Sequence, residues 1–418
     1  MKYSLLYGKG KLAFDLDDSI HADIISTKNV PGIYHPEAEL MKALENPIST
    51  VPLSSLIANP HMTVGIVFSD ITRASPSKIM LPVILNQLKA IPRENIRLFN
   101  ALGTHRANTE DELRKMLGEE IVENFRIIQN NSDDMETQIY LGDDSFHHEI
   151  WINQEFYDCD LKILTGFIEP HFFAGFSGGG KAIIPGMAGW KTIFANHSRD
   201  MITQPNATWG ITDGNPFYEE VNEIIQRCGK IFLVNVTTNN QHEITGIFCG
   251  DPVSAHDAGC RFMKETSMFQ VPEAYDIVIT SNSGYPLDLN LYQSVKGMSA
   301  AAKIVKPGGS IIMAAECCEG FPDHGYFKQR LFQEKKVEDL FEWINSPHPT
   351  EQDEWQVIIL SEVLRKAKVF FYSDGLDDEK MRQAFLTPIH SISDAVKNIH
   401  PHEKICILPE GPLTIPYL

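Results

Sequence analysis

The sequence is short of positive charge. Its 36 Lys and Arg residues stand against 55 Asp and Glu residues, which gives a formal net charge of −19, and no segment gathers basic side chains into a cluster. Proteins that bind nucleic acid neutralise its phosphates with clustered Lys and Arg, so we expect no nucleic-acid partner. A small anionic ligand remains compatible with an acidic protein, provided that a few Arg and Lys residues converge at one point.

Long hydrophobic runs are missing as well. No apolar run approaches the roughly 20 residues that span a membrane, and Met1–Gly10 contains too short an apolar stretch for a signal peptide. The seven cysteines are odd in number and include no C-x-x-C pair. We therefore expect reduced, mostly buried thiols in a cytoplasmic protein that has no membrane partner.

What is present indicates an α/β protein. Strand-like runs recur along the chain, and most are followed by a turn and a helical pattern, which is typical of parallel sheets. A hairpin is expected first, formed by Tyr3–Tyr7 and Lys11–Leu16. The later predicted strands are Thr63–Phe68, Ile96–Leu102, Leu161–Thr165, Ile231–Val236, Ile277–Thr280, Ser310–Ala314, Val357–Leu360 and Val369–Tyr372.

Two domains are predicted, because 418 residues are too many for one ordinary core. Pro272 and its polar neighbours mark the boundary. We expect an N-terminal α/β domain over 1–270 and a C-terminal α/β domain over 271–418, with the last residues packing back on the first domain. Segment 319–356 is rich in charged and aromatic residues and indicates a helical insertion.

A glycine-rich loop from Glu169 to Lys181 follows one of the predicted strands and supplies an acid, an imidazole, a hydroxyl, flexible backbone and a lysine. Such a loop can surround a phosphate-bearing ligand. The loop also comes close to the G-x-x-x-x-G-K pattern of P-loop enzymes. That pattern requires Ser or Thr after the lysine as a ligand of Mg²⁺, and the residue here is Ala182. A P-loop phosphotransferase is therefore only an alternative.

Polar residues also follow two other predicted strands directly. Asp70 and Arg73 come after Thr63–Phe68, and His105 comes after Ile96–Leu102. Ligands of open α/β sheets bind at the carboxyl ends of the strands, so these residues and His171 of the loop indicate a site. Taken alone, Asp70 could instead cap the helix that Pro76 helps to begin, with Arg73 in solvent.

Three histidines are candidates for chemistry. His105 and His171 suit acid–base catalysis, because the pKa of imidazole lies near neutrality. His197, in an Asn-His-Ser turn, could bind a metal or be structural. Together the three could form the zinc site of a hydrolase, although their spacing matches no zinc motif. In the second half, Gln293 and Lys296 lie one helical turn apart on a small-residue-rich helix, where they either face solvent or point at a ligand.

These residues, in this order, resemble the lactate racemase family, whose members use a nickel-pincer nucleotide. The resemblance covers most of the chain. Each motif is weak alone, and their order and spacing together are specific. The anchors are Asp70-x-x-Arg73, Gly103-Thr104-His105-Arg106, Glu169-Pro170-His171 with Lys181, His197, Tyr292-Gln293-x-x-Lys296 and Trp355.

The resemblance implies a two-domain α/β fold with mostly parallel sheets and an active site in the interdomain cleft. It implies that Lys181 holds the nickel pyridinium-3,5-bisthiocarboxylic acid mononucleotide covalently, that His197 ligates the nickel, and that His105 and His171 are the paired acid–base catalysts. The remaining implied contacts are to the cofactor, from Asp70, Ser177, Gly178 and Gly179, and to the substrate, from Arg73, Tyr292, Gln293, Lys296 and Trp355. Of these, Arg73 and Lys296 are also implied to be catalytic.

The implied reaction is inversion of the C2 centre of a 2-hydroxy acid by hydride transfer to and from the cofactor, through a 2-keto acid. Hydride transfer avoids a carbanion beside a carboxylate, and two bases serve the two faces of the planar intermediate. The substrate is lactate or, slightly favoured, a larger aryl, dicarboxylic or sugar acid, which would make the enzyme a racemase or epimerase. Cofactor-maturation enzymes are the implied partners, and the oligomeric state is not predicted. A non-catalytic ligand-binding protein is the remaining alternative.

Overall fold

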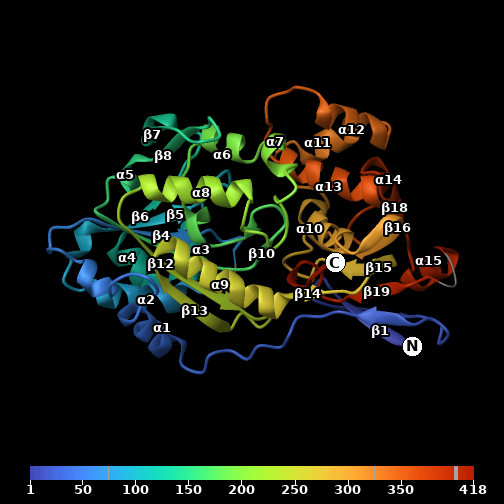
Figure 1. The fold of residues 1–418 in the computed structure, drawn as a ribbon, viewed down its shortest axis with the longest axis horizontal. Helices are drawn as coiled ribbons and strands as arrows, with labels where there is room; N and C mark the ends of the chain where they lie inside the picture. Colours follow the sequence, from blue (N-terminus) through green and yellow to red (C-terminus); the bar gives the residue numbers. More distant parts are fainter. Residues whose placement is uncertain (74, 323–324, 400–402) are drawn as a thin grey trace. The chain divides into compact units, whose positions relative to one another are not determined.

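Two six-stranded sheets organise the chain, one in each of two compact units (Figure 1). The computed structural model describes residues 1–73, 75–322, 325–399 and 403–418. Asp323 and His324 of the predicted insertion therefore lie outside the described residues. Unit 1 comprises Met1–Lys28, Ser198–Thr203 and Glu265–Leu418, and unit 2 comprises Asn29–His197 and Gln204–Lys264.

The sheet of unit 2 is parallel except for one edge strand, β13, which pairs antiparallel with β12. Its central strand β9 is buried at every residue, in agreement with the mostly apolar run in the sequence. The strands, in spatial order, are β13 (Ile244–Gly250), β12 (Ile231–Thr238), β9 (Leu161–Phe167), β4 (Val64–Ser69), β5 (Ile96–Ala101) and β6 (Arg126–Gln129).

Helices cover both faces of this sheet, and successive strand residues alternate between them. Ile66 and Phe68 face a core with α1 (Pro36–Glu45), α2 (Ser77–Gln87), α3 (Glu110–Leu117) and α4 (Glu119–Asn124). Val67 faces the other core. That core is closed by α5 (Gln154–Tyr157), α6 (Trp190–Asn196), α8 (Pro216–Arg227) and the hairpin of β7 (Gln138–Asp143) and β8 (Glu149–Asn153).

The sheet of unit 1 is parallel throughout. Its strands, in spatial order, are β18 (Thr387–Pro388), β17 (Lys368–Tyr372), β16 (Val305–Ala314), β15 (Tyr275–Ser281), β19 (Ile405–Leu408) and β3 (Ala22–Ile24). The hairpin of β1 (Lys2–Tyr7) and β2 (Gly10–Asp15) packs with α15 (Ile392–Ile399) on one face. The other helices of this unit are α10 (Leu291–Ala302), α11 (Phe327–Gln333), α12 (Val337–Asn345), α13 (Glu354–Lys366) and α14 (Asp378–Gln383).

The division into units differs from the predicted domain ranges at the N-terminus, because residues 1–28 belong with the C-terminal sheet. The hairpin contributes to the core of that sheet, and β3 pairs with β19. Backbone contacts hold the hairpin there, since Leu6 donates to the Pro409 carbonyl at 3.0 Å and Gly8 donates to the Asp288 carboxylate at 2.7 Å. The last strand, β20 (Ile415–Tyr417), pairs with β14 (Met268–Gln270) inside the same unit.

One predicted strand is wrong. Val357–Leu360 lies within helix α13, not in a sheet. All residues from Glu354 to Ser361 are buried, so the segment lacks the exposed polar positions that reveal a helical period. A short apolar run of this kind does not distinguish a buried helix from a buried strand. The predicted N-terminal hairpin and the other predicted strands are confirmed, as is the helical character of 319–356 over its described residues.

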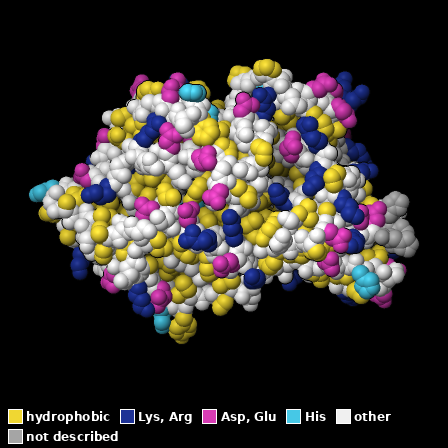
Figure 2. All heavy atoms as spheres, viewed as in Figure 1, with side chains coloured by type: hydrophobic (Ala, Val, Ile, Leu, Met, Phe, Trp, Pro, Cys, Tyr) yellow, Lys and Arg dark blue, Asp and Glu magenta, His cyan; other side chains and the backbone are white. Residues whose placement is uncertain are grey.

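The α/β class with mostly parallel sheets is confirmed. Acidic and basic side chains are interspersed on the face that Figure 2 shows. The seven cysteines are free thiols, all buried except Cys318. Among the described residues, no helix combines the length and the apolar character that crossing a bilayer demands.

Candidate active site

Three neighbouring strands of unit 2 deliver the candidate residues to one edge. Strands β9, β4 and β5 lie side by side and run parallel. Asp70 follows β4, His105 follows β5, and His171 follows β9 by four residues. The prediction that three strand ends meet at one edge of the sheet is therefore confirmed.

Asp70 and His105 form the best-defined pair at this edge. The Asp70 carboxylate lies 2.7 Å from Nδ1 of His105 and accepts a further hydrogen bond from Thr72. Burial alone would raise the pKa of Asp70, but the hydrogen bond from His105 and the charges of His105 and Arg73 outweigh it and lower this pKa. An ionised carboxylate only accepts, so Nδ1 of His105 donates and Nε2 is the nitrogen that can take a proton.

The alternative role of Asp70 as a helix cap is wrong. Helix α2 begins at Ser77 after Pro76, and no side chain caps it. Asp70 instead sits in a turn that the Arg73 backbone N–H closes by donating to the Asp70 carbonyl at 3.1 Å. Its buried carboxylate is thus directed to His105, while Arg73 is half-buried.

The glycine-rich loop folds back on itself through its own hydroxyl and backbone groups. Ser177 donates to the Phe167 carbonyl and accepts from the Glu169 backbone N–H, both at 3.0 Å. The N–H of Gly179 donates to Asn235 at 2.7 Å. A Cβ at Gly180 would overlap Val221 and Ile225 of α8, so only glycine allows this close approach. The Ser177 hydroxyl and the Gly179 N–H therefore form hydrogen bonds that hold the shape of the loop.

This shape disagrees with a P-loop. A P-loop directs its backbone N–H groups at phosphate and opens a helix. Here Gly179 and Lys181 lie in a single 3-10 turn, η4 (Gly179–Ala182), and the Gly179 N–H is bonded to a side chain of β12. The loop therefore lacks the geometry that a P-loop phosphotransferase requires.

Phe173 lies in contact with three of the candidate residues. Its ring centroid is 4.5 Å from that of His171, 5.3 Å from that of His197 and 5.6 Å from Nζ of Lys181. His171 lies in a small hairpin of β10 (Pro170–His171) and β11 (Gly175–Phe176), where Nδ1 accepts from the Ala174 N–H at 3.3 Å. In a neutral ring, Nε2 of His171 then carries the proton.

His197 has the properties of a metal ligand. Its Nδ1 lies 3.1 Å from the Ile193 carbonyl, which only accepts, so Nδ1 donates and Nε2 keeps the lone pair. A metal-binding histidine is usually held in this way. Burial, together with the charge of Lys181, lowers the pKa of His197 to about 3, which keeps the ring neutral.

The residues around Phe173 fit the nucleotide cofactor that the family resemblance implies. His197 offers one neutral nitrogen, and the charge of Lys181 is close enough to act on the ring of His197. Phe173 lies against both side chains. The zinc alternative fits less well. Among the residues that the structure describes, the group of mutually close metal-binding side chains is Asp144, His148 and Glu220, which includes none of the three predicted histidines.

The remaining predicted residues lie in unit 1. Trp355 Nε1 donates to the Tyr292 hydroxyl at 2.9 Å, so the two predicted pocket residues are joined. Gln293 and Lys296 are half-buried on α10. This helix packs closely, as expected, because a Cβ at Gly297 would lie 2.5 Å from the Ser281 carbonyl oxygen.

Comparison with known proteins identifies the family. Residues 7–210 match the lactate racemase N-terminal domain, and residues 271–415 match the lactate racemase C-terminal domain. The chain belongs to the lactate racemase family. A lactate racemase of Thermoanaerobacterium thermosaccharolyticum is 38% identical over 97% of this chain and 96% of its own length. A lactate racemase of Lactiplantibacillus plantarum is 34% identical over 97% of both chains.

Solved structures agree with this assignment. The structure of the lactate racemase apoprotein from T. thermosaccharolyticum superposes with a TM-score of 0.93, at 36% identity over 100% of both chains. A Thermotoga maritima crystal structure matches with a TM-score of 0.68, at 17% identity over 91% of this chain and 97% of that one, and it shares the fold.

Several residues of the candidate site could not be found from the sequence. Asn235 holds Gly179 from a strand 56 residues away, and His256 of α9 (Pro252–Ser267) donates from Nε2 to the Ser177 carbonyl at 2.9 Å. These contacts follow from the sheet order and leave no local pattern. Phe173 follows His171 by two residues, and the sequence does not distinguish it from Phe172 and Phe176 of the same loop.

Proposed function

We propose that this protein is an isomerase that racemises a 2-hydroxy acid with the help of a nickel-pincer nucleotide. The observation that carries the proposal is the opposite protonation of two imidazoles at one sheet edge. Asp70 leaves Nε2 of His105 as a proton acceptor, whereas the Ala174 N–H leaves Nε2 of His171 as a donor. A C2 hydroxyl needs an acceptor and a C2 carbonyl needs a donor, so this pair suits both forms of the substrate oxygen.

The protein's own residues would then divide the work. His105 takes the hydroxyl proton, and the Asp70 carboxylate stabilises the imidazolium that forms. His171 would donate a proton from Nε2 to the substrate oxygen when the keto acid presents its other face. Arg73 and Lys296 would hold the substrate carboxylate electrostatically while the planar keto acid reorients, with Gln293, Tyr292 and Trp355 as further substrate contacts.

When bound, the cofactor supplies the hydride acceptor that these side chains lack. His197 would hold the nickel through Nε2, and Lys181 would attach the nucleotide covalently. Asp70, Ser177, Gly178 and Gly179 would shape its surroundings. The shape of the loop supports this role, because Gly178 and Gly179 adopt φ values of +77° and +57°, a backbone conformation that favours glycine and lets the loop turn tightly. Loading of the cofactor would make the maturation enzymes partners of this protein.

The substrate is proposed as lactate first. Two lactate racemases that align over nearly the whole chain support this choice. The preference for a larger aryl, dicarboxylic or sugar acid stays a prediction. Loading the protein with cofactor and following the loss of optical purity in a panel of 2-hydroxy acids tests both. Turnover of lactate alone would exclude the larger substrates, and turnover of none would contradict the proposed function.

Substituting Asp70 by Asn should lower kcat by about 10²-fold or more, with a smaller effect on KM. The amide of Asn can donate to Nδ1 of His105, which moves the ring proton to Nε2 and removes the proton acceptor. Nitrogen-15 chemical shifts of the imidazole report the tautomer, and the pH profile reports the base. As a matched control, Thr72→Val removes only the second donor to Asp70 and should keep the tautomer. A normal kcat in Asp70→Asn would refute this role of Asp70.

A further inference from the structure

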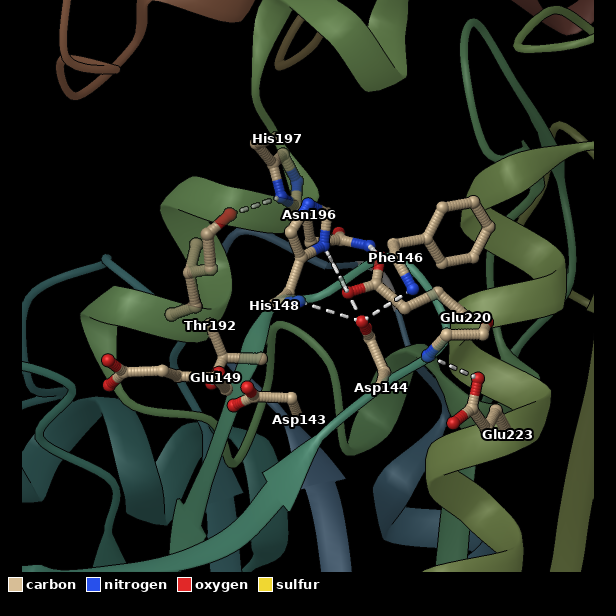
Figure 3. Close-up of polar contacts among 12 residues, drawn as sticks. Asp143, Asp144, Phe146, His148, Glu149, Thr192, Asn196, His197, Glu220 and Glu223 are labelled. Carbon is tan, nitrogen blue, oxygen red and sulfur yellow. Dashed lines mark hydrogen bonds and ion pairs between the residues drawn. The ribbon is translucent and has the colours of Figure 1, made fainter.

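A second group of metal-binding side chains lies beside the candidate active site in unit 2. Figure 3 shows Asp144, His148 and Glu220 pointing toward one another. Asp144 and His148 come from the turn between β7 and β8, and Glu220 comes from α8. Their ligand atoms all lie within 4.8 Å of one another. Nothing in the proposed racemase chemistry uses these residues.

The orientation of Asp144 is fixed, and one of its oxygens lacks a hydrogen bond. Oδ1 accepts from the backbone N–H groups of Phe146 and His148, at 2.9 and 2.8 Å. Oδ2 is buried without a hydrogen-bond partner. It lies 3.8 Å from Nδ1 of His148 and is aimed into the group. An unsatisfied carboxylate oxygen inside a protein is costly, so its position calls for a ligand.

Glu220 faces the same point. Its Oε1 lies 3.0 Å from Nδ1 of His148, and its Oε2 accepts from the side-chain amide of Asn196 at 2.5 Å. The side chains of Asp144 and Glu220 have no exposed surface. Among the described residues, His148 is the ion-pair partner of both carboxylates, and no Lys or Arg pairs with either. Burial raises the pKa of Glu220 to about 7.

We propose that Asp144, His148 and Glu220 bind a divalent transition-metal cation, zinc in the first place. One imidazole nitrogen and two carboxylate oxygens are ligands that zinc accepts. Bonds of about 2.1 Å in a tetrahedral site place neighbouring ligand atoms roughly 3.4 Å apart. The distances from His148 Nδ1, 3.0 Å to Glu220 and 3.8 Å to Asp144, lie on either side of that value.

The cation would hold the end of α6 in place. Asn196, the last residue of α6, donates to Glu220, and the next residue is His197. A cation that fixes Glu220 would therefore fix the residue before the proposed nickel ligand, and it would join the β7–β8 turn to α8. The cation site does not depend on the proposed racemase activity, because its ligands are separate from the nickel ligand.

The test uses the full-length protein purified without the maturation enzymes, stripped of metal and titrated with Zn²⁺. We expect about one zinc per chain and a higher melting temperature with zinc. His148→Ala and, separately, Glu220→Gln should each raise the Kd for zinc by at least about 10-fold and abolish the rise in melting temperature. Co²⁺ in place of zinc should give the absorption of a tetrahedral site.

Matched controls lie next to each ligand. His147→Ala removes an exposed imidazole, and Glu223→Gln removes a carboxylate one turn along α8. Both should bind zinc as the unchanged protein does. The proposal is overturned if the unchanged protein takes up no zinc, or if His148→Ala and Glu220→Gln bind it normally. The two buried carboxyls would then share a proton. A folded protein that binds zinc but, after production with the maturation enzymes, racemises no acid would contradict only the proposed function.

Discussion

Replacing either His105 or His171 by alanine should lower the rate of racemisation by about 10²–10⁴-fold, the usual contribution of a positioned acid or base. Each histidine is expected to serve the oxygen of the substrate in one direction of the reaction. Loss of one therefore stops the full cycle, even though the other remains. The measurement is the initial rate of loss of optical purity, started from each enantiomer in turn. Both variants should show the lowered rate from either enantiomer.

An exposed histidine provides the control, because His61→Ala removes an imidazole outside the site and should leave the rate unchanged. Ligand binding should be measured alongside. A non-catalytic binding protein would keep its affinity in both variants and show no turnover to lose. Normal turnover in both His105→Ala and His171→Ala would mean that the acid–base assignment is wrong.

Protein produced together with the maturation enzymes should contain about one nickel per chain, and His197→Ala should lose it. The reason is the neutral His197 ring, whose Nδ1 is held by the Ile193 carbonyl. Lys181→Ala should lose the nucleotide from denatured protein, because the proposed covalent link is then absent. Elemental analysis measures the nickel, and the intact mass of the protein measures the adduct.

The control for this experiment is Lys191→Ala. Lys191 lies on the same segment of chain but pairs with Glu149 on the surface, so nickel and adduct should both be retained. Folded protein without nickel under these conditions would contradict the cofactor assignment. An intact mass without an adduct, in protein that does hold nickel, would contradict only the covalent attachment at Lys181.

The residues at the strand ends could be predicted because the carboxyl ends of parallel strands all lie at one edge of the sheet. Asp70 and His105 are 35 residues apart, yet each directly follows a recognisable apolar run. Their contact follows once β4 and β5 are neighbours in the sheet. The role of Asp70 as a cap was plausible for the same local reasons, and only the start of α2 at Ser77 excludes it.

The proposed cation site could not be predicted, because the partners of its residues leave no periodic signal in the sequence. Glu220 lies in the middle of an amphipathic helix, and only the fold places it beside Asn196 and His148. Helix α13 shows a different problem. Its apolar run fits a strand as well as a helix, because Glu354–Ser361 are all buried and lack the exposed polar positions from which a helical period is read.

The pairing of β3 with β19 determines when the sheet of unit 1 can be completed during synthesis. Ala22–Ile24 is made well before Ile405–Leu408, the strand with which it pairs. Residues 29–197 and 204–264 can form their sheet as soon as they emerge, whereas the first 28 residues must wait for their partners. A nascent chain therefore exposes the apolar side of the β1–β2 hairpin until strands β15 and β16 emerge. Termination before β15 would leave that hairpin and β3 without a sheet to join, which makes such products targets for chaperones and proteases.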